Sequence, residues 1–218
     1  MSVPEIISNV ATSTGAGGFL FEKVMEGTLK LLIPAFEADG YSVSIYDEQK
    51  IRDLFNEQSL NGVDHMVELK HSAGQHILFF MQEKWKLVTN QREVSQFLDC
   101  CARIKSRMVG FQGDIYKFWI TRTVPTENGA KSLEEGGAYV IQTSTSMNML
   151  AASSALLLCE VIGKRELAIP MIRAVPSFLL QEIPQETVVR NLDVKLVPAP
   201  TFKASKVKVN VRREETEN

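Results

Sequence analysis

Three polar residues on two predicted strands have the types and the spacing that a hydrolytic metal site needs. Asp64 follows an Asn61-Gly62 turn, while Gln82 and Lys84 interrupt the apolar run 76–87. Because side chains alternate along a strand, Gln82 and Lys84 project from the same face, two residues apart. If Asp64 faces them, its carboxylate and the Gln82 carbonyl can hold Mg²⁺, which prefers oxygen ligands.

The neighbouring groups predict how such a site would act. The backbone carbonyl of Glu83 can add a ligand, and Mn²⁺ can substitute for Mg²⁺. Lys84 would then stand near the phosphate and a metal-bound water, stabilising negative charge as hydroxide attacks. The alternative is that Asp64, Gln82 and Lys84 form the exposed polar face of a hairpin, which is common in antiparallel pairs. The apolar character of the rest of the strand favours the metal site.

The hairpin that carries these residues lies within an alternation of helices and strands. Apolar residues recur every second position in the strands and every three to four positions in the helices, and Asn90 caps one helix. The predicted strands cover 41–46, 63–69, 76–87, 115–123 and 138–142, and the predicted helices cover 19–38, 48–57, 91–107, 128–135 and 147–162. This alternation indicates an α/β domain whose later strands are parallel.

Composition predicts one domain between two segments of different character. With 24 Lys+Arg against 26 Asp+Glu and 44% hydrophobic residues, the chain is neither a disordered acidic tail nor a highly basic nucleic-acid coat protein. Residues 1–18 are rich in Ser, Thr, Gly and Ala and are expected to form a flexible arm. Residues 19–163 form the domain, and residues 164–218, broken by prolines, form an extended appendage.

Cysteine use and hydropathy suggest an intracellular protein without a membrane span. Cys100, Cys101 and Cys159 form an odd set with no CxxC spacing, which argues against a disulfide framework and a zinc cage. The most apolar stretch, 147–163, contains polar residues and is shorter than the roughly 20 residues that a bilayer needs. We therefore expect a reducing compartment, either cytoplasm or nucleus, and no membrane partner.

The order of these motifs resembles the PD-(D/E)xK nuclease superfamily, in the Q-x-K variant of the Mrr-like restriction endonucleases. The likeness centres on Gly62-Val63-Asp64 and on Gln82-Glu83-Lys84, about eighteen residues later. It covers roughly 19–163. The other segments similar to family positions are Phe21-Glu22, Asp39-Gly40-Tyr41, Phe118-Trp119-Ile120-Thr121, Gly129-Ala130-Lys131 and Ala138-Tyr139-Val140-Ile141.

The resemblance implies both a fold and an activity. The fold is a restriction-endonuclease-like core, a mixed central sheet flanked by helices in an αβββαβ-type order, with the C-terminal appendage outside it. The activity is Mg²⁺-dependent endonucleolytic hydrolysis of DNA, with Asp64 and Gln82 as metal ligands and Lys84 as the catalytic lysine. Glu22 matches the acid that the first helix often supplies. Glu26, one turn later, is its rival for that role.

Two departures from the family pattern leave other functions open. Gln82 replaces an acid, which lowers the charge of the ligand set, and His65 rather than Gly follows Asp64. A catalytically inactive nuclease fold that binds nucleic acid or assists protein assembly is therefore an alternative. Resolution of branched DNA, such as a Holliday junction, shares the chemistry and would require a homodimer with two sites.

The C-terminal appendage carries the charge expected of a DNA-binding segment. Residues 190–213 contain seven Lys and Arg against one Asp, a local charge of +6. Cationic contacts to phosphates supply most of the sequence-independent affinity for DNA. The expected contacts are Lys203, Lys206, Lys208 and Arg212. A solvated tail without this role is the alternative.

Overall fold

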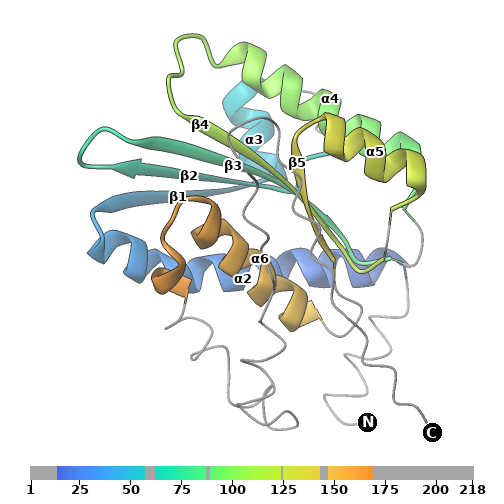
Figure 1. Ribbon diagram of the computed structural model, residues 1–218, viewed down its shortest axis with the longest axis horizontal. Helices are drawn as coiled ribbons and strands as arrows, with labels where there is room; N and C mark the ends of the chain where they lie inside the picture. The colour runs from blue at the N-terminus through green and yellow to red at the C-terminus, as the bar shows by residue number, and fades with distance from the viewer. Residues whose placement is uncertain (1–13, 57–61, 87–88, 124, 143–146, 169–218) are drawn as a thin grey trace, which may run out of the picture.

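A computed structural model describes residues 14–56, 62–86, 89–123, 125–142 and 147–168. They form a five-stranded sheet whose strand order follows the chain (Figure 1). The strands are Tyr41–Asp47 (β1), His65–His71 (β2), His76–Lys84 (β3), Asp114–Thr121 (β4) and Ala138–Gln142 (β5). The helices are Thr14–Ala38 (α2), Glu48–Phe55 (α3), Gln91–Arg107 (α4), Glu127–Glu135 (α5) and Met147–Val161 (α6), followed by a 3₁₀ turn, Arg165–Leu167 (η1).

The sheet combines an antiparallel half with a parallel half. β1 pairs with β2, and β2 with β3, in antiparallel fashion, whereas β3 with β4 and β4 with β5 pair in parallel. Each parallel connection runs through a helix, α4 or α5, as crossovers of this kind require. The predicted hairpin, the parallel later strands and the α/β class with a mixed, helix-flanked sheet are confirmed.

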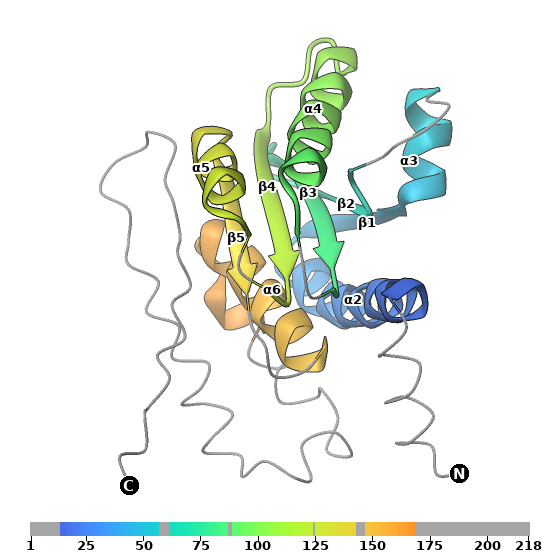
Figure 2. The same cartoon turned by 90° about the vertical axis from the view of Figure 1, so that its right-hand side faces the viewer.

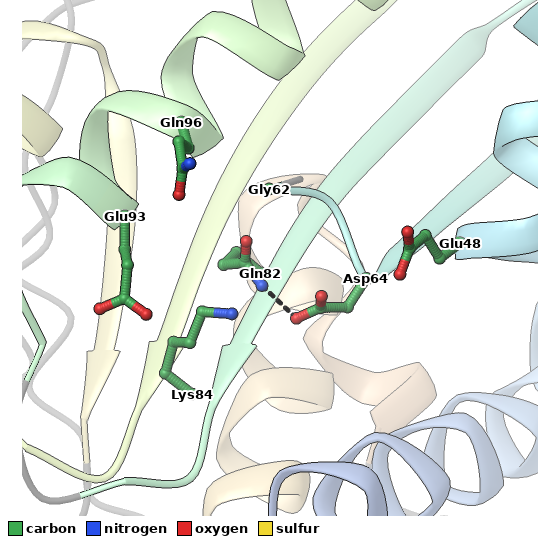
Figure 3. Close-up of a pocket in the computed structure, with 7 residues that line it drawn as sticks. All are labelled: Glu48, Gly62, Asp64, Gln82, Lys84, Glu93 and Gln96. Atoms are coloured by element: carbon green, nitrogen blue, oxygen red, sulfur yellow. Dashed lines mark hydrogen bonds between the residues drawn. The ribbon is translucent and has the colours of Figure 1, made fainter. Parts of the chain in front are cut away.

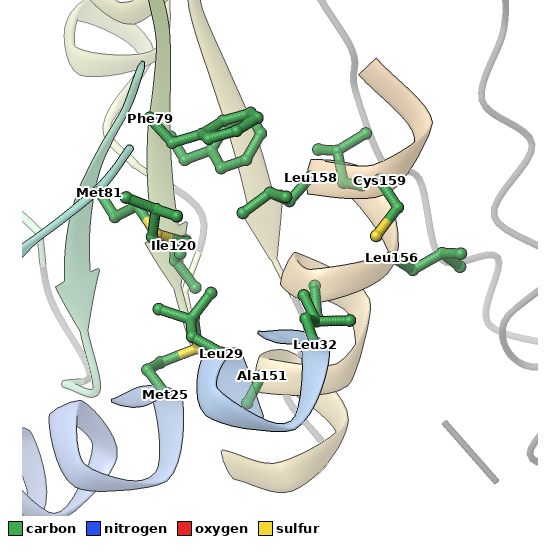
Figure 4. Packing of buried hydrophobic residues seen from close by; sticks show 14 of the residues in the cluster. Met25, Leu29, Leu32, Phe79, Met81, Ile120, Ala151, Leu156, Leu158 and Cys159 are labelled. Carbon is green, nitrogen blue, oxygen red and sulfur yellow. The ribbon is translucent and has the colours of Figure 1, made fainter. Parts of the chain in front are cut away.

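Helices cover both faces of the sheet (Figure 2). On one face α2 and α6 pack over a core that includes Met25, Leu29, Phe79, Met81 and Leu158, all almost fully buried (Figure 4). On the other face, α3, α4 and α5 enclose a second core that includes Ile51, Phe80, Phe97, Trp119 and Leu133. Burial of this much apolar surface on each face is the main stabilising contribution to such a layered domain.

The alternation of β3 decides which face each later residue occupies. Phe79 and Met81 point toward α2, whereas Leu78 and Phe80 point toward α4. By the same period of two, Gln82 and Lys84 continue on the α4 side and Glu83 on the α2 side. The polar end of β3 is therefore divided between two environments.

Two helix starts show what local sequence can and cannot predict. The predicted Asn90 cap of α4 is confirmed, and Glu93 completes a capping box with it. In contrast, α2 begins at Thr14 instead of Phe19, so the helix takes up the last five residues, 14–18, of the segment expected to be a flexible arm. The glycines of this segment have low helix propensity, but Gly17 is buried, and tertiary packing overrides propensity there.

Several expectations fall outside the described residues. The +6 stretch at 190–213 lies there, and with it Lys203, Lys206, Lys208 and Arg212. So do residues 1–13 of the expected arm and the appendage from residue 169 onward. Within the described parts of the chain, no helix has the length and apolar content needed to cross a bilayer.

Candidate active site

Asp64, Gln82 and Lys84 come together where β3 ends (Figure 3). The antiparallel register pairs His65 with Met81, so Asp64, one residue before β2, lies opposite Gln82. The backbone N–H of Asp64 donates to the Met81 carbonyl at 2.8 Å. One Asp64 oxygen, Oδ2, accepts hydrogen bonds from the Gln82 amide and, at 2.6 Å, from the Glu83 backbone N–H. The structure thus places these three residues as their spacing predicts.

These side chains line a pocket of about 370 Å³ between the sheet, α3 and α4. The pocket residues are Glu48, Gly62, Asp64, Gln82, Lys84, Glu93 and Gln96. Glu48, Glu93 and Gln96 were not predicted from the sequence. For Glu48 the missing information is the register of β1, because Asp47 pairs with His65 and so sets Glu48 beside Asp64. Glu93 and Gln96 depend on how α4 packs, which no local motif encodes.

A close approach of backbone to backbone shapes one wall of the pocket. Gly62 has a φ of +136°, and a Cβ at this position would lie 2.7 Å from the Gln96 carbonyl oxygen and 2.8 Å from Phe97 Cα. Only glycine fits both the conformation and the space. Gly62 therefore allows the loop that carries Asp64 to lie directly against α4.

Lys84 is the cation of this pocket. Its side chain extends toward the Asp64 and Gln82 pair (Figure 3). Among the residues that the structure describes, no carboxylate lies within ion-pair distance of its ammonium group. The ammonium group is thus available to an anionic ligand.

Glu22 on α2 interacts electrostatically with the charged groups of the pocket. Burial raises the pKa of Glu22, and the Asp64 carboxylate raises it further, while His65 and Lys84 oppose the shift. The pKa of Glu48 is raised in the same way, first by burial and then by Asp64. The Asp64 carboxylate thus repels both glutamates, and Lys84 does not fully compensate this repulsion.

The rival acid on α2 has a different environment. Glu26 accepts hydrogen bonds from Lys23 at 2.9 Å and Lys30 at 2.6 Å. These two lysines hold the pKa of Glu26 down at about 2. Glu26 is therefore committed to a surface ion-pair network, whereas Glu22 lies within electrostatic range of Asp64. Of the two glutamates, Glu22 is the one whose pKa responds to Asp64.

Glu83 contributes its backbone to the pocket and its side chain to the opposite face. There, Glu83 Oε1 lies 2.8 Å from His65 Nδ1, and both side chains are buried. Burial raises the pKa of Glu83 to about 7, although His65 opposes the shift. Burial lowers the pKa of His65, but the Glu83 carboxylate outweighs it, and the pKa of His65 is raised. This pair was not predicted, because it depends on the register of β2 against β3.

The donor set suits a hard cation that keeps several waters. Asp64 supplies a carboxylate, and the repulsion of Glu22 and Glu48 by Asp64 is the kind that a divalent ion relieves. A half-turn of the Gln82 amide would present its oxygen in place of the nitrogen that now faces Asp64. Over the described ranges, no three His, Cys, Asp or Glu side chains gather closely enough to hold a metal by themselves. A metal would therefore depend on Gln82, on backbone oxygen and on water.

Comparison with known proteins gives no independent information about this pocket. The chain matches no protein-family model, no curated protein and no solved structure. The chemistry that the pocket offers is oxygen donors beside an available lysine, an arrangement suited to a cation together with an anionic group. Cys100, Cys101 and Cys159 are buried in the cores and offer no exposed nucleophile.

Proposed function

We propose that the protein is a Mg²⁺-dependent nuclease that hydrolyses phosphodiester bonds in DNA. The observation that carries this proposal is the convergence of Asp64, Gln82 and Lys84 on one polar pocket. Glu22 adds a carboxylate from the opposite side. A phosphodiester supplies the negative partner that Lys84 lacks within the described ranges, and a cation offsets the repulsion among the acids.

Each residue has a role that follows from its position. Asp64 and Gln82 would hold the metal, with the Glu83 carbonyl as a further donor. When bound, Mg²⁺ supplies positive charge that offsets the phosphate and eases deprotonation of water. Lys84 stabilises the charge that develops on the phosphate oxygens. Glu22, whose pKa is raised, can accept a proton from the attacking water.

We further propose that the sheet is the core of a PD-(D/E)xK nuclease. In support, the chain order is a helix, three strands, a helix and a strand, with α3 inserted between the first two strands. The paired polar residues stand just before β2 and at the end of β3, where the resemblance in sequence is strongest. Gln82 keeps an oxygen donor at the position of the usual acid.

Cleavage assays test the proposal directly. Supercoiled, linear and branched DNA are incubated with the protein in Mg²⁺ or Mn²⁺, and the products are separated on gels. Asp64→Asn and Lys84→Ala should each reduce the rate by about a hundredfold or more. Lys70→Ala is the matched control. Lys70 is not among the pocket residues, and its ammonium group lies 2.9 Å from a carboxylate oxygen of Glu68. Cleavage that persists unchanged in both pocket variants would rule out this site.

A second candidate function is a catalytically inactive DNA-binding module. It is favoured by the hydrogen bond from the Gln82 amide to Asp64, which occupies one carboxylate oxygen without a metal. Isothermal titration calorimetry separates the two functions, since the inactive module should bind DNA without taking up Mg²⁺. Preferential cleavage of branched DNA by a homodimer would instead identify a junction resolvase.

A further inference from the structure

An arginine follows β4 at the end of the sheet where Lys84 closes β3, and its side chain lies over Trp85, whose ring packs with Phe21 of α2. In the parallel pairing of β3 with β4, Lys84 is opposite Thr121, and the N–H of the next residue, Arg122, donates to the Lys84 carbonyl at 3.1 Å. Thr123 ties the same segment down, because its hydroxyl donates to the Lys86 carbonyl at 3.2 Å. The backbone of Arg122 is therefore fixed next to Lys84, the residue that we assign to phosphate chemistry.

The side chain of Arg122 is held in place by an aromatic ring. Its guanidinium carbon lies 5.1 Å from the ring centroid of Trp85. Trp85 is only 8% exposed, and its ring centroid lies 5.5 Å from that of Phe21. The ring itself is therefore a rigid support. A guanidinium stacked on a ring keeps its N–H edge available for a planar, bidentate anion.

Among the described residues, Arg122 also lacks the carboxylate partner that a half-buried cation usually has. The nearby cation Lys86, which follows β3, is paired with Glu93. For Arg122, the described part of the chain provides the Trp85 ring and no carboxylate. Because Asp64 and its neighbouring acids repel a polyanion, DNA needs a cationic contact outside the pocket to approach it.

We propose that Arg122, supported by Trp85, binds a backbone phosphate of the DNA strand next to the position that Lys84 serves. The inference deepens the proposed function and rests on it for the identity of the ligand. It assigns Arg122 to binding and not to the chemical step. A substitution should therefore alter affinity for DNA and leave the turnover rate at saturating DNA unchanged.

The test measures DNA binding apart from cleavage. Fluorescein-labelled duplex DNA is titrated with the full chain in EDTA, and anisotropy gives the dissociation constant over a series of salt concentrations. Arg122→Gln should weaken binding about tenfold to hundredfold and reduce the salt slope by about one. Arg122→Lys should recover part of the loss, because it keeps the charge but not the bidentate fork.

Two controls make the result specific. Arg165→Gln removes an exposed arginine that pairs with Glu160 at 3.7 Å, far along the chain from the pocket, and should bind DNA as the wild type does. DNA should also change the tryptophan emission, and Trp85→Phe should abolish that change, since Trp119 is fully buried. Circular dichroism confirms that each variant is folded.

The outcomes separate this contact from the nuclease proposal. If Arg122→Gln binds DNA as tightly as Arg165→Gln does, the proposed contact between Arg122 and a DNA phosphate is wrong, even if the wild type cleaves DNA. If Arg122 is needed for binding but no cleavage occurs under any condition, the contact stands and the nuclease proposal fails. If the wild type binds no DNA, both are overturned.

Discussion

One oxygen of Asp64 organises the pocket at the scale of single residues. Oδ2 accepts both the Gln82 amide and the Glu83 backbone N–H, which fixes the carboxylate on β3. Among the described residues, no hydrogen bond engages its other oxygen. A carboxylate held in advance loses less conformational freedom when a ligand binds, so its affinity is higher than that of a mobile one.

The two glutamates of α2 provide a matched pair for testing the acid at this site. Glu22→Gln should lower Mn²⁺ affinity about tenfold to hundredfold, because it removes a carboxylate from the field of Asp64. Glu26→Gln should leave the Mn²⁺ affinity unchanged, because Glu26 forms ion pairs with Lys23 and Lys30. Isothermal titration calorimetry with Mn²⁺ alone gives both constants. Equal effects of the two substitutions would contradict the assignment of Glu22.

At the scale of elements, the pocket exists because a loop, two helices and a strand end meet. The loop before β2 packs against α4 through Gly62, and α3 begins directly after β1 ends. The side chain of Asp47 caps α3 by accepting from the Lys50 N–H at 2.9 Å. The wall that carries Glu48 is thereby fixed by a local cap, while the opposite wall depends on close packing.

Gly62→Ala tests this packing. The added methyl group would collide with backbone atoms at 2.7 and 2.8 Å and meet an unfavourable φ, so we expect a loss of about 1–3 kcal/mol in the free energy of unfolding, with weaker metal binding. Gly74→Ala is the control, because Gly74 also has a positive φ, +95°, but open space around it. Chemical denaturation should show the larger loss for Gly62→Ala, and equal losses would exclude the steric explanation.

The elements also show how far the sequence could predict the site. The hairpin and α4 were predicted because alternation, helical spacing and the Asn90 cap are local signals. The beginning of α2 was misplaced because glycine-rich sequence hides a helix that packing stabilises. Glu48 and the His65–Glu83 pair were missed because they depend on pairing between strands distant in the chain. The convergence of Asp64, Gln82 and Lys84 could be predicted because it depends only on the pairing of β2 with β3 in one hairpin.

At the scale of the whole molecule, the sheet separates the pocket from a buried polar pair. Gln82 and Lys84 face the α4 side, while His65 and Glu83 lie under α2, among apolar residues. Glu83 Oε2 is buried and finds no hydrogen-bond partner among the described residues. An ionised carboxylate in that setting is costly, so the protonation state of the pair affects the stability of the entire domain.

Stability should therefore depend on pH in a defined direction. The pKa of Glu83 rises from 4.5 to about 7 on folding, and that of His65 is raised as well, so both bind protons more tightly in the folded chain. The contribution of Glu83 is complete below its unfolded pKa of 4.5 and is lost as the pH rises through about 7, whereas that of His65 is complete below its unfolded pKa of 6.5 and is lost above it. We expect the free energy of unfolding of the metal-free protein to fall across this window.

Urea denaturation at a series of pH values measures this effect. Glu83→Gln should flatten the dependence. Glu68→Gln is the control: burial raises the pKa of Glu68, but hydrogen bonds from Lys70 and His76 outweigh it, and the net pKa is lowered. Glu68 thus titrates below the window. A profile in which both variants retain the wild-type slope would show that the buried pair is not its source.

The agreement between strand order and chain order has a consequence for how the domain is built. Each new strand can add to the edge of the strand made just before it, from β1 to β5, without waiting for a later segment to insert. Asp64, Gln82 and Lys84 lie within one hairpin, whose closure needs only nearby residues and is fast. During synthesis, the residues proposed for chemistry can be aligned before Arg122 and the parallel half of the sheet emerge.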